Sequence, residues 1–326
     1  MKHLKNTFGI LFMTTILFTS CERIEGIDND CDGDCIAPAT AEEFSNLKTE
    51  ALEALTQNFK FNVEDGSTTF TSLAGVDITI NGNCLKLNDE AVTGEVDIEY
   101  IELFDKGNML ITNKPTMGVN DAGDKALLIS GGEFLINATQ NGEVLKTTCS
   151  IRILVPSNLT GDVDSDMLLW EGNIDADDNL AWEVAEGRGD QGGVFTEGEQ
   201  YFAFLQQFGW SNIDRFYSDP RDKTTILVEA PFGYDYTNSA IYLSYDGEDT
   251  GLAALDTFED GLFSEHYGQI PIGLECHIIF VTEDDDNWKY AIKEVTIVED
   301  ETIIFTEDET TTATEAELIT VINGLP

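Results

Sequence analysis

The chain has 326 residues, 42% of them hydrophobic, and a formal net charge of −45 from 62 acidic residues against 17 Lys and Arg. This apolar fraction is typical of globular proteins, so wholesale disorder is excluded and the length allows two domains with their own cores. Nucleic acids and anionic lipid surfaces would be repelled over the whole molecule and are disfavoured as ligands. The acidic excess serves solubility, or it binds divalent cations such as Ca2+, and the composition favours the first explanation.

The first residues have the pattern of an export signal. A short basic start is followed by an apolar run, residues 8–18, that is too short to span a bilayer permanently. The signal, predicted over residues 1–20, ends in Leu17-Phe18-Thr19-Ser20-Cys21, which resembles the lipobox of bacterial lipoproteins. The resemblance implies that Cys21 is acylated, with palmitate for example, and becomes the first residue of a chain anchored in the outer membrane or at the cell surface. An ordinary secretory signal that stops near a cysteine is the alternative.

Residues 21–39 are predicted to be an acidic, cysteine-containing tether, because they hold too few apolar side chains to build a core. Part of it matches the first half of a calcium-binding EF-hand loop: Asp28, Asp30, Asp32 and Gly33. The twelfth position, where a bidentate Glu belongs, is Ala39. A Ca2+ site and a plain acidic spacer are both open, and the spacer is favoured. The acidic run behind Cys21 also resembles the surface-export signal of Bacteroidota lipoproteins.

The folded part is predicted to begin with a helix over residues 41–59. Thr40 and Glu43 have the spacing of a capping box, in which each side chain bonds the backbone N–H of the other residue. The following apolar residues recur at helical spacing and form one stripe: Phe44, Leu47, Ala51 and Leu55.

From about residue 70 to residue 156 the hydrophobic period changes from about 3.6 residues to about 2. The pair Asn141-Gly142 predicts a hairpin turn, because both residues tolerate positive φ. These strands have one dry and one wet face, which indicates an antiparallel sandwich within a first domain at 40–157. The dry faces include Val76, Ile78 and Ile80, then Val96, Ile98 and Tyr100, then Phe134, Ile136 and Ala138.

Three strand-and-turn segments of this domain are distinctive, Thr71–Ile80, Val92–Tyr100 and Gly131–Ala138. They are similar to a module that recurs in Bacteroidota surface lipoproteins and that distantly resembles the β-sandwich of zona-occludens proteins and netrin receptors. The resemblance implies a non-catalytic interaction domain and supplies no catalytic residues. This chain has Ile80-Asn81-Gly82-Asn83 where that pattern has a proline-containing entry strand.

Of the six cysteines, five remain once Cys21 is lipidated, so at least one is a free thiol or forms an intermolecular bond. Cys149 and Cys276 alternate with apolar residues and are predicted to be small buried side chains. Cys84 can pair with Cys149 if their strands face each other, which the sequence leaves open.

A second β domain is predicted at 158–305, and its most aromatic segment is residues 201–217. In one interpretation Trp210, Phe216 and Tyr217 form a stacking platform for sugars, with Asn212 and Asp214 as hydrogen-bond partners. In the other, the aromatic side chains belong to a core and Asp214 forms an internal ion pair with Arg215. The core is favoured, because aromatic residues carry much of the buried area in such cores.

The remaining chain, 306–326, is predicted to be an acidic, Thr-rich tail with a short helix that Thr314 and Glu317 cap. The expected fold is therefore mainly β: two antiparallel β-sandwich-like domains, an N-terminal helix and a short C-terminal helix.

Catalytic motifs are absent from the sequence. It contains no Gly-x-Ser-x-Gly, no His-Glu-x-x-His and no phosphate-binding glycine loop, and after signal removal the only histidines are His266 and His277. The prediction is a lipid-anchored extracytoplasmic binding or structural protein without catalytic activity, whose partners are the membrane, through the anchor, and a glycan or protein. The alternatives are a glycan-binding component of a polysaccharide uptake system and an acidic glycoside hydrolase, since paired carboxylates must occur among so many acidic residues.

Overall fold

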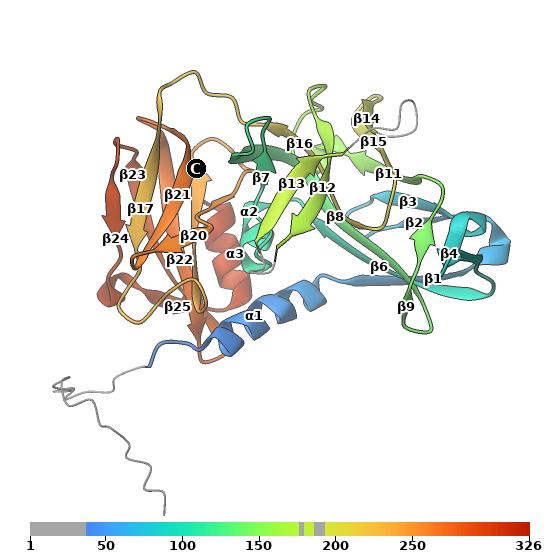
Figure 1. The fold of residues 1–326 in the computed structure, drawn as a ribbon, viewed down its shortest axis with the longest axis horizontal. Coiled ribbons are helices and arrows are strands. Elements are labelled where there is room, and N and C mark those ends of the chain that lie inside the picture. The colour runs from blue at the N-terminus through green and yellow to red at the C-terminus, as the bar shows by residue number, and fades with distance from the viewer. Residues whose placement is uncertain (1–36, 176–178, 186–192) are drawn as a thin grey trace, which may run out of the picture. The chain divides into compact units, whose positions relative to one another are not determined.

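The structure, a computed structural model, describes residues 37–175, 179–185 and 193–326 (Figure 1). The predicted signal, the predicted acylation site Cys21 and the candidate calcium ligands Asp28, Asp30 and Asp32 lie outside the described residues. The mainly β fold is confirmed, and the described helices are α1 (Ala41–Ala54), α2 (Lys106–Ile111) and α3 (Glu315–Asn323). None of these helices is long and apolar enough to span a lipid bilayer.

The first sandwich has an eight-stranded and a five-stranded sheet facing each other, with a small three-stranded sheet at one end. The eight-stranded sheet has the order β1 (Gln57–Asn62), β6 (Glu95–Leu103), β8 (Lys125–Gln140), β16 (Gly209–Phe216), β12 (Leu168–Ile174), β13 (Leu180–Val184) and β7 (Met117–Val119), with β9 (Glu143–Val144) paired to β8. The five-stranded sheet has the order β14 (Gly193–Thr196), β15 (Gln200–Leu205), β11 (Ile151–Pro156), β3 (Asp77–Asn81) and β2 (Ser67–Thr71). The small sheet is β10 (Lys146–Thr147), β4 (Leu85–Leu87) and β5 (Glu90–Ala91).

The alternating residues predicted for these strands form the core between the two large sheets. Ile98 and Ile136 from one sheet, and Ile78 and Ile153 from the other, are all at most 1% exposed. Asn141 and Gly142 have φ of 53° and 84° and form the predicted turn between β8 and β9. These local predictions are confirmed.

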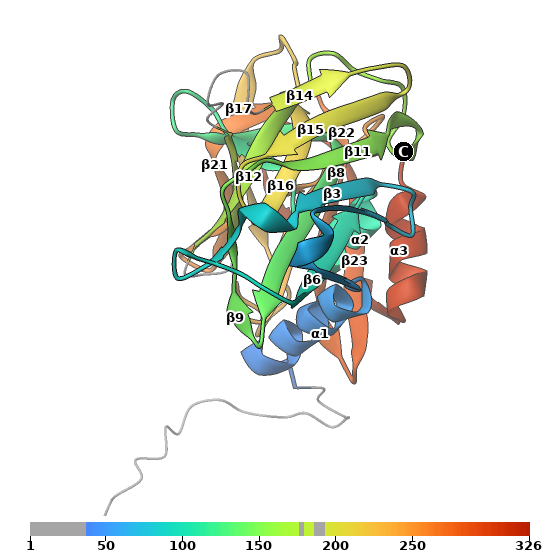
Figure 2. The same cartoon turned by 90° about the vertical axis from the view of Figure 1, so that its right-hand side faces the viewer.

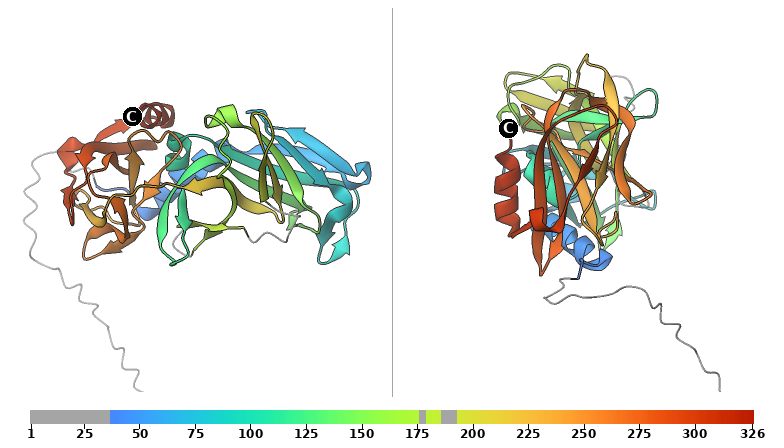
Figure 3. Two further views of the ribbon diagram at one scale, coloured as in Figure 1. Left: turned by 90° about the horizontal axis from the view of Figure 1, so that it is seen from above. Right: turned by 90° about the vertical axis from the view of Figure 1, so that its left-hand side faces the viewer.

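The second sandwich pairs a four-stranded with a five-stranded sheet; Figure 3 shows its orange and red strands gathered beside the first sandwich. The four-stranded sheet has the order β20 (Thr257–Glu259), β21 (Leu262–Pro271), β17 (Lys223–Glu229) and β24 (Thr302–Ile304). The five-stranded sheet has the order β19 (Ala253–Ala254), β18 (Ser239–Tyr245), β22 (Glu275–Asp284), β23 (Asn287–Thr296) and β25 (Thr311–Ala313). Strand β8 serves both cores. Its Leu127 and Ile129 belong to the core of the second sandwich, and its Phe134 and Ile136 belong to the core of the first sandwich.

The three helices pack together where the two sandwiches meet, and Figures 1 and 2 show α1 below the strands and α3 at their outer side. Their apolar side chains pack on the outward residues of β6 and on β18, β22 and β23, so that both sheets are buried on two faces. This cluster contains Phe44 and Ala51 of α1, Met109, Leu110 and Ile111 of α2, Leu318 and Ile322 of α3, Ile101 and Leu103 of β6, Tyr242, Ile279, Val281 and Trp288.

Two predicted boundaries are wrong. The first helix ends at Ala54 and not at residue 59, because β1 begins at Gln57 and Phe59 pairs with Ile98 of β6. The domain boundary placed at residue 157 falls inside the first sandwich, because β11 pairs with β15 and β8 pairs with β16. Alternation identifies a strand but does not name its partner, so residues 168–216 were assigned to the wrong core.

Candidate binding pocket

The residues predicted as a sugar platform lie on or just after β16; Asn212 and Asp214 are buried, and the three aromatic side chains are half-buried. Asn212 and Asp214 have 0% exposure. The aromatic rings point into separate clusters: Trp210 lies 6.5 Å from Trp182 between ring centroids, and Tyr217 lies 5.2 Å from Tyr245. These residues therefore present no common flat surface to a ligand, and their geometry is that of core side chains.

The internal ion pair predicted between Asp214 and Arg215 is wrong. Arg215 donates from Nε to Asp164 at 2.6 Å, at the surface of the sandwich. Asp214 instead accepts from the Asn212 side chain at 2.5 Å, and Asn212 accepts from Ser130 at 3.1 Å. The pairing of β16 with β8 shifts its register between Asn212 and Asp214, and both polar side chains are completely buried.

Sequence reasoning missed the most unusual member of this cluster, Glu133 of β8. It has 0% exposure, and neither carboxylate oxygen has a hydrogen-bond partner among the described residues. Burial raises the pKa of Glu133 well above its ordinary value, the Asp214 charge raises it further, and Lys114 opposes both. Burial likewise raises the pKa of Asp214. Neither carboxyl lines the cavities described below, so the pair is a buried polar core.

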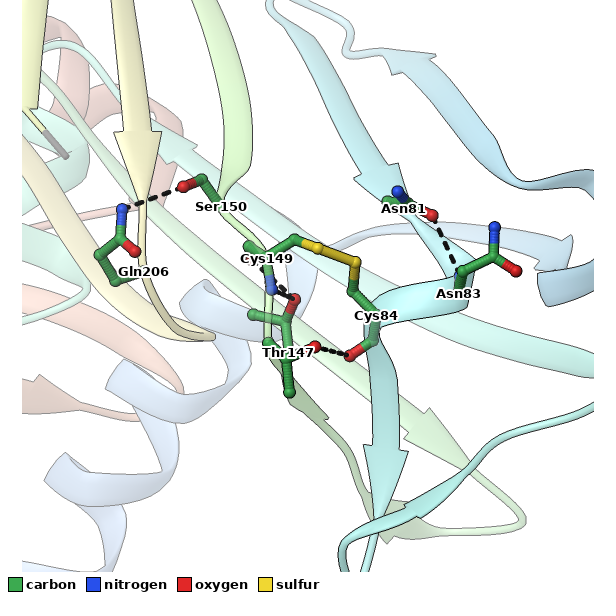
Figure 4. The surroundings of a disulfide bond; sticks show 8 residues. Asn81, Asn83, Cys84, Thr147, Cys149, Ser150 and Gln206 are labelled. Atoms are coloured by element: carbon green, nitrogen blue, oxygen red, sulfur yellow. Dashed lines mark hydrogen bonds between the residues drawn. A yellow bond between two sulfur atoms is a disulfide. The ribbon is translucent and has the colours of Figure 1, made fainter. Parts of the chain in front are cut away.

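Cys84 and Cys149 form a disulfide bond at the end of the first sandwich, with their Cα atoms 5.6 Å apart (Figure 4). Thr148 Oγ1 donates to the Cys84 carbonyl at 3.1 Å, and Thr147 Oγ1 to that of Cys149 at 2.8 Å. The prediction of a buried, strand-borne Cys149 is wrong, since the residue is exposed and β11 begins only at Ile151. Cys276 is buried as predicted and is the free cysteine of the described part of the chain.

A cavity of about 290 Å³ opens between α1, the end of α2 and the second sandwich. Its size is at the lower limit of the ~300–1,000 Å³ that is common for ligand pockets. One wall is aromatic: the Tyr236 ring lies 5.9 Å from Phe258, which lies 4.9 Å from Phe263. Tyr236 is 58% exposed at the mouth. The rest of the lining includes Phe44, Lys48, Asn113, Asn179, Tyr242 and Asp256.

The inner end of this pocket is polar. Lys125 of β8 forms an ion pair with Asp256 Oδ2 at 2.5 Å, and the Tyr267 hydroxyl donates to the same oxygen at 3.2 Å. Burial and the neighbouring Asp256 charge raise the pKa of Tyr267 far above its ordinary value, so it remains a donor. Oδ1 of Asp256 is buried and has no hydrogen-bond partner among the described residues. Tyr242 donates to Asn113 Oδ1 at 2.7 Å and closes the floor.

Tyr236, Phe258 and Asp256 show no hydrophobic periodicity, because Tyr236 and Asp256 lie outside regular elements and β20, which holds Phe258, has only three residues. The available signal was the aromatic, glycine-containing stretch Phe232-Gly233-Tyr234-Asp235-Tyr236 between two predicted strands. A second concavity, lined by polar side chains such as Glu171, Gln206 and Gln207, is broad and lacks an aromatic wall of this kind.

No model of a known protein family matches the chain, and no curated protein was found to be similar to it. Among residues 37–175, 179–185 and 193–326, no three His, Cys, Asp or Glu side chains are grouped in a way that could hold a metal ion.

Proposed function

We propose that the protein is a lipid-anchored extracytoplasmic binding protein without catalytic activity, held at the outer membrane or cell surface by acylated Cys21. The observation that carries the proposal is the Cys84–Cys149 disulfide, which joins residues 65 positions apart. Disulfides persist in oxidising compartments and are rare in the cytosol, so this bond agrees with the export signal at residues 1–20. Bound ligand would be presented by two sandwiches that pack against shared helices.

A binding function is supported by a difference in accessibility: the pocket is open to solvent, whereas the carboxyls with the most strongly raised pKa values are buried. The pocket has an accessible aromatic mouth and a polar end, the arrangement by which small-molecule sites combine contact area with orientation. Glu133 and Asp214, whose pKa values are strongly raised, lie elsewhere and have 0% exposure.

Anchoring is tested by replacing Cys21 with Ser, fractionating the cells and measuring the mass of the first peptide of the mature chain. The wild-type protein should sediment with membranes and begin with an acylated Cys21, while Cys21→Ser should leave the membrane pool. Cys276→Ala is the matched control, since it removes a buried thiol far from the predicted signal and should remain membrane-bound. An unmodified amino terminus, or an unchanged membrane pool in Cys21→Ser, would refute the anchor.

A further inference from the structure

We propose that the pocket beside Tyr236 binds one neutral pyranose unit of a saccharide. The inference rests on the proposed binding function and adds the chemical class of the ligand. It places saccharide recognition at the junction of α1 and the second sandwich, away from the aromatic segment of β16.

The aromatic wall provides the apolar half of the site. Three rings follow one another, Tyr236, Phe258 and Phe263, and their exposure falls from 58% at the mouth to 2% at the inner end. The Phe258 ring is fixed from behind by Phe263 in an edge-to-face contact, so the wall is formed before a ligand arrives. The C–H face of a pyranose ring is flat and weakly apolar, and it packs on such a surface without requiring a charge.

The inner end provides the polar half. Asp256 Oδ1 is a buried acceptor without a partner among the described residues, and such a group is costly unless a donor reaches it. Behind it lies a small cavity of about 10 Å³, lined in part by Asn113, Asn179 and Asp256 and large enough for about one water molecule. A sugar hydroxyl at the pocket end would donate to this oxygen, directly or through that water.

Charge distinguishes a sugar from an organic cation, the other ligand class that aromatic walls attract. The protein is strongly acidic overall, with a net charge of −45, yet the Asp256 charge is already neutralised by Lys125 at 2.5 Å. The other charged side chain among the described lining residues is Lys48, a cation. A cationic ligand would meet Lys48 and find its counter-ion occupied, whereas a neutral donor-rich ligand meets neither obstacle.

The test uses the full-length mature protein in detergent and methyl pyranosides of glucose, galactose, mannose and N-acetylglucosamine. Saturation-transfer NMR identifies binding, and calorimetry measures affinity. We expect at least one pyranoside to bind, Tyr236→Ala to weaken it about tenfold or more, and Phe232→Ala to have no effect. Phe232 is a matched control because it lies four residues away, is 100% exposed and does not line the pocket.

Two further arms define the ligand. A trisaccharide of the bound sugar should bind at least as tightly as the monosaccharide, and a trisaccharide that does not bind would contradict recognition of one unit of a saccharide. Monodeoxy analogues should show one hydroxyl whose loss costs about tenfold or more, the one that donates to Asp256.

Three outcomes would overturn the proposal: no pyranoside binds, Tyr236→Ala binds as well as Phe232→Ala, or tetramethylammonium binds in place of every sugar. None of these would alter the acylation of Cys21, so the failure of the ligand assignment is distinguishable from failure of the anchor.

Discussion

Lys125 and Asp256 form an ion pair that joins the two sandwiches, with Lys125 on β8 and Asp256 just before β20. Both side chains are nearly buried, at 13% and 11% exposure, and the pair closes the inner end of the pocket. The pair joins the two sandwiches through one carboxylate oxygen of Asp256, and the other oxygen has no hydrogen-bond partner among the described residues.

Removing the cation of this pair should destabilise the fold. Lys125→Met leaves Asp256 buried without its counter-ion, and we expect a loss of about 3 kcal/mol in the free energy of unfolding, measured with urea. The matched control is Lys60→Met, whose pair with Asp97 is exposed, so that its loss should cost far less free energy of unfolding. Equal losses in both variants would show that the junction does not depend on this pair.

The disulfide should contribute strongly to stability, because it closes a long loop of the unfolded chain. For residues 65 positions apart, the chain-entropy model predicts about 4 kcal/mol, so Cys149→Ser should unfold at much lower urea concentration than the wild-type protein. Leu73→Ala, at a position just after β2 that is 90% exposed, serves as the control. A Cys149→Ser variant as stable as that control would contradict the bond.

Trp210→Ala separates the core interpretation of β16 from the platform interpretation. The Trp210 ring packs on Trp182 and on the small cluster around it, so truncation should leave a cavity and cost about 3 kcal/mol. Phe195→Ala removes an aromatic ring that is 53% exposed and should change the free energy of unfolding by less than about 0.5 kcal/mol. If Trp210→Ala kept full stability but lost sugar binding, the platform interpretation would be right.

Glu265 of β21 should make the protein less stable as the pH rises. Burial raises its pKa from 4.5 to about 7, although the N–H groups of Gly268 and Gln269 donate to it. Between these two values the folded chain keeps a proton that the unfolded chain has lost, so this residue's stabilising contribution is present below pH 4.5 and is lost as the pH rises through about 7.

Glu265→Gln cannot ionise and should therefore gain stability relative to wild type over that pH window, by roughly 3 kcal/mol at its upper end. The difference is measured by urea unfolding at several pH values. Glu259→Gln, at an exposed position of the neighbouring strand, should leave the pH profile unchanged. If the free energy of unfolding changed with pH in the same way in Glu265→Gln and the wild type, Glu265 would have the same pKa in the folded and the unfolded chain.

Much of the local structure was predictable because it depends on neighbours in sequence. Thr40 and Glu43 exchange the hydrogen bonds of a capping box, and Asn141-Gly142 turns the chain, since only three or four residues are involved in each. Alternation identified Val96, Ile98 and Tyr100 as buried because strand geometry sends successive side chains to opposite faces. The same rule failed at Cys149, where the strand begins two residues later.

The mainly β class, the helix caps, the turns and the buried face of most strands could be inferred from the amino-acid sequence, because each follows from backbone geometry over a few residues. The pairing of β16 with β8, the Cys84–Cys149 bond and the pocket that Tyr236, Phe258 and Asp256 share become visible in the folded chain alone. Those contacts join segments far apart in the chain, and the choice among many equally apolar strands is made by how well two faces pack. Periodicity carries no record of that complementarity.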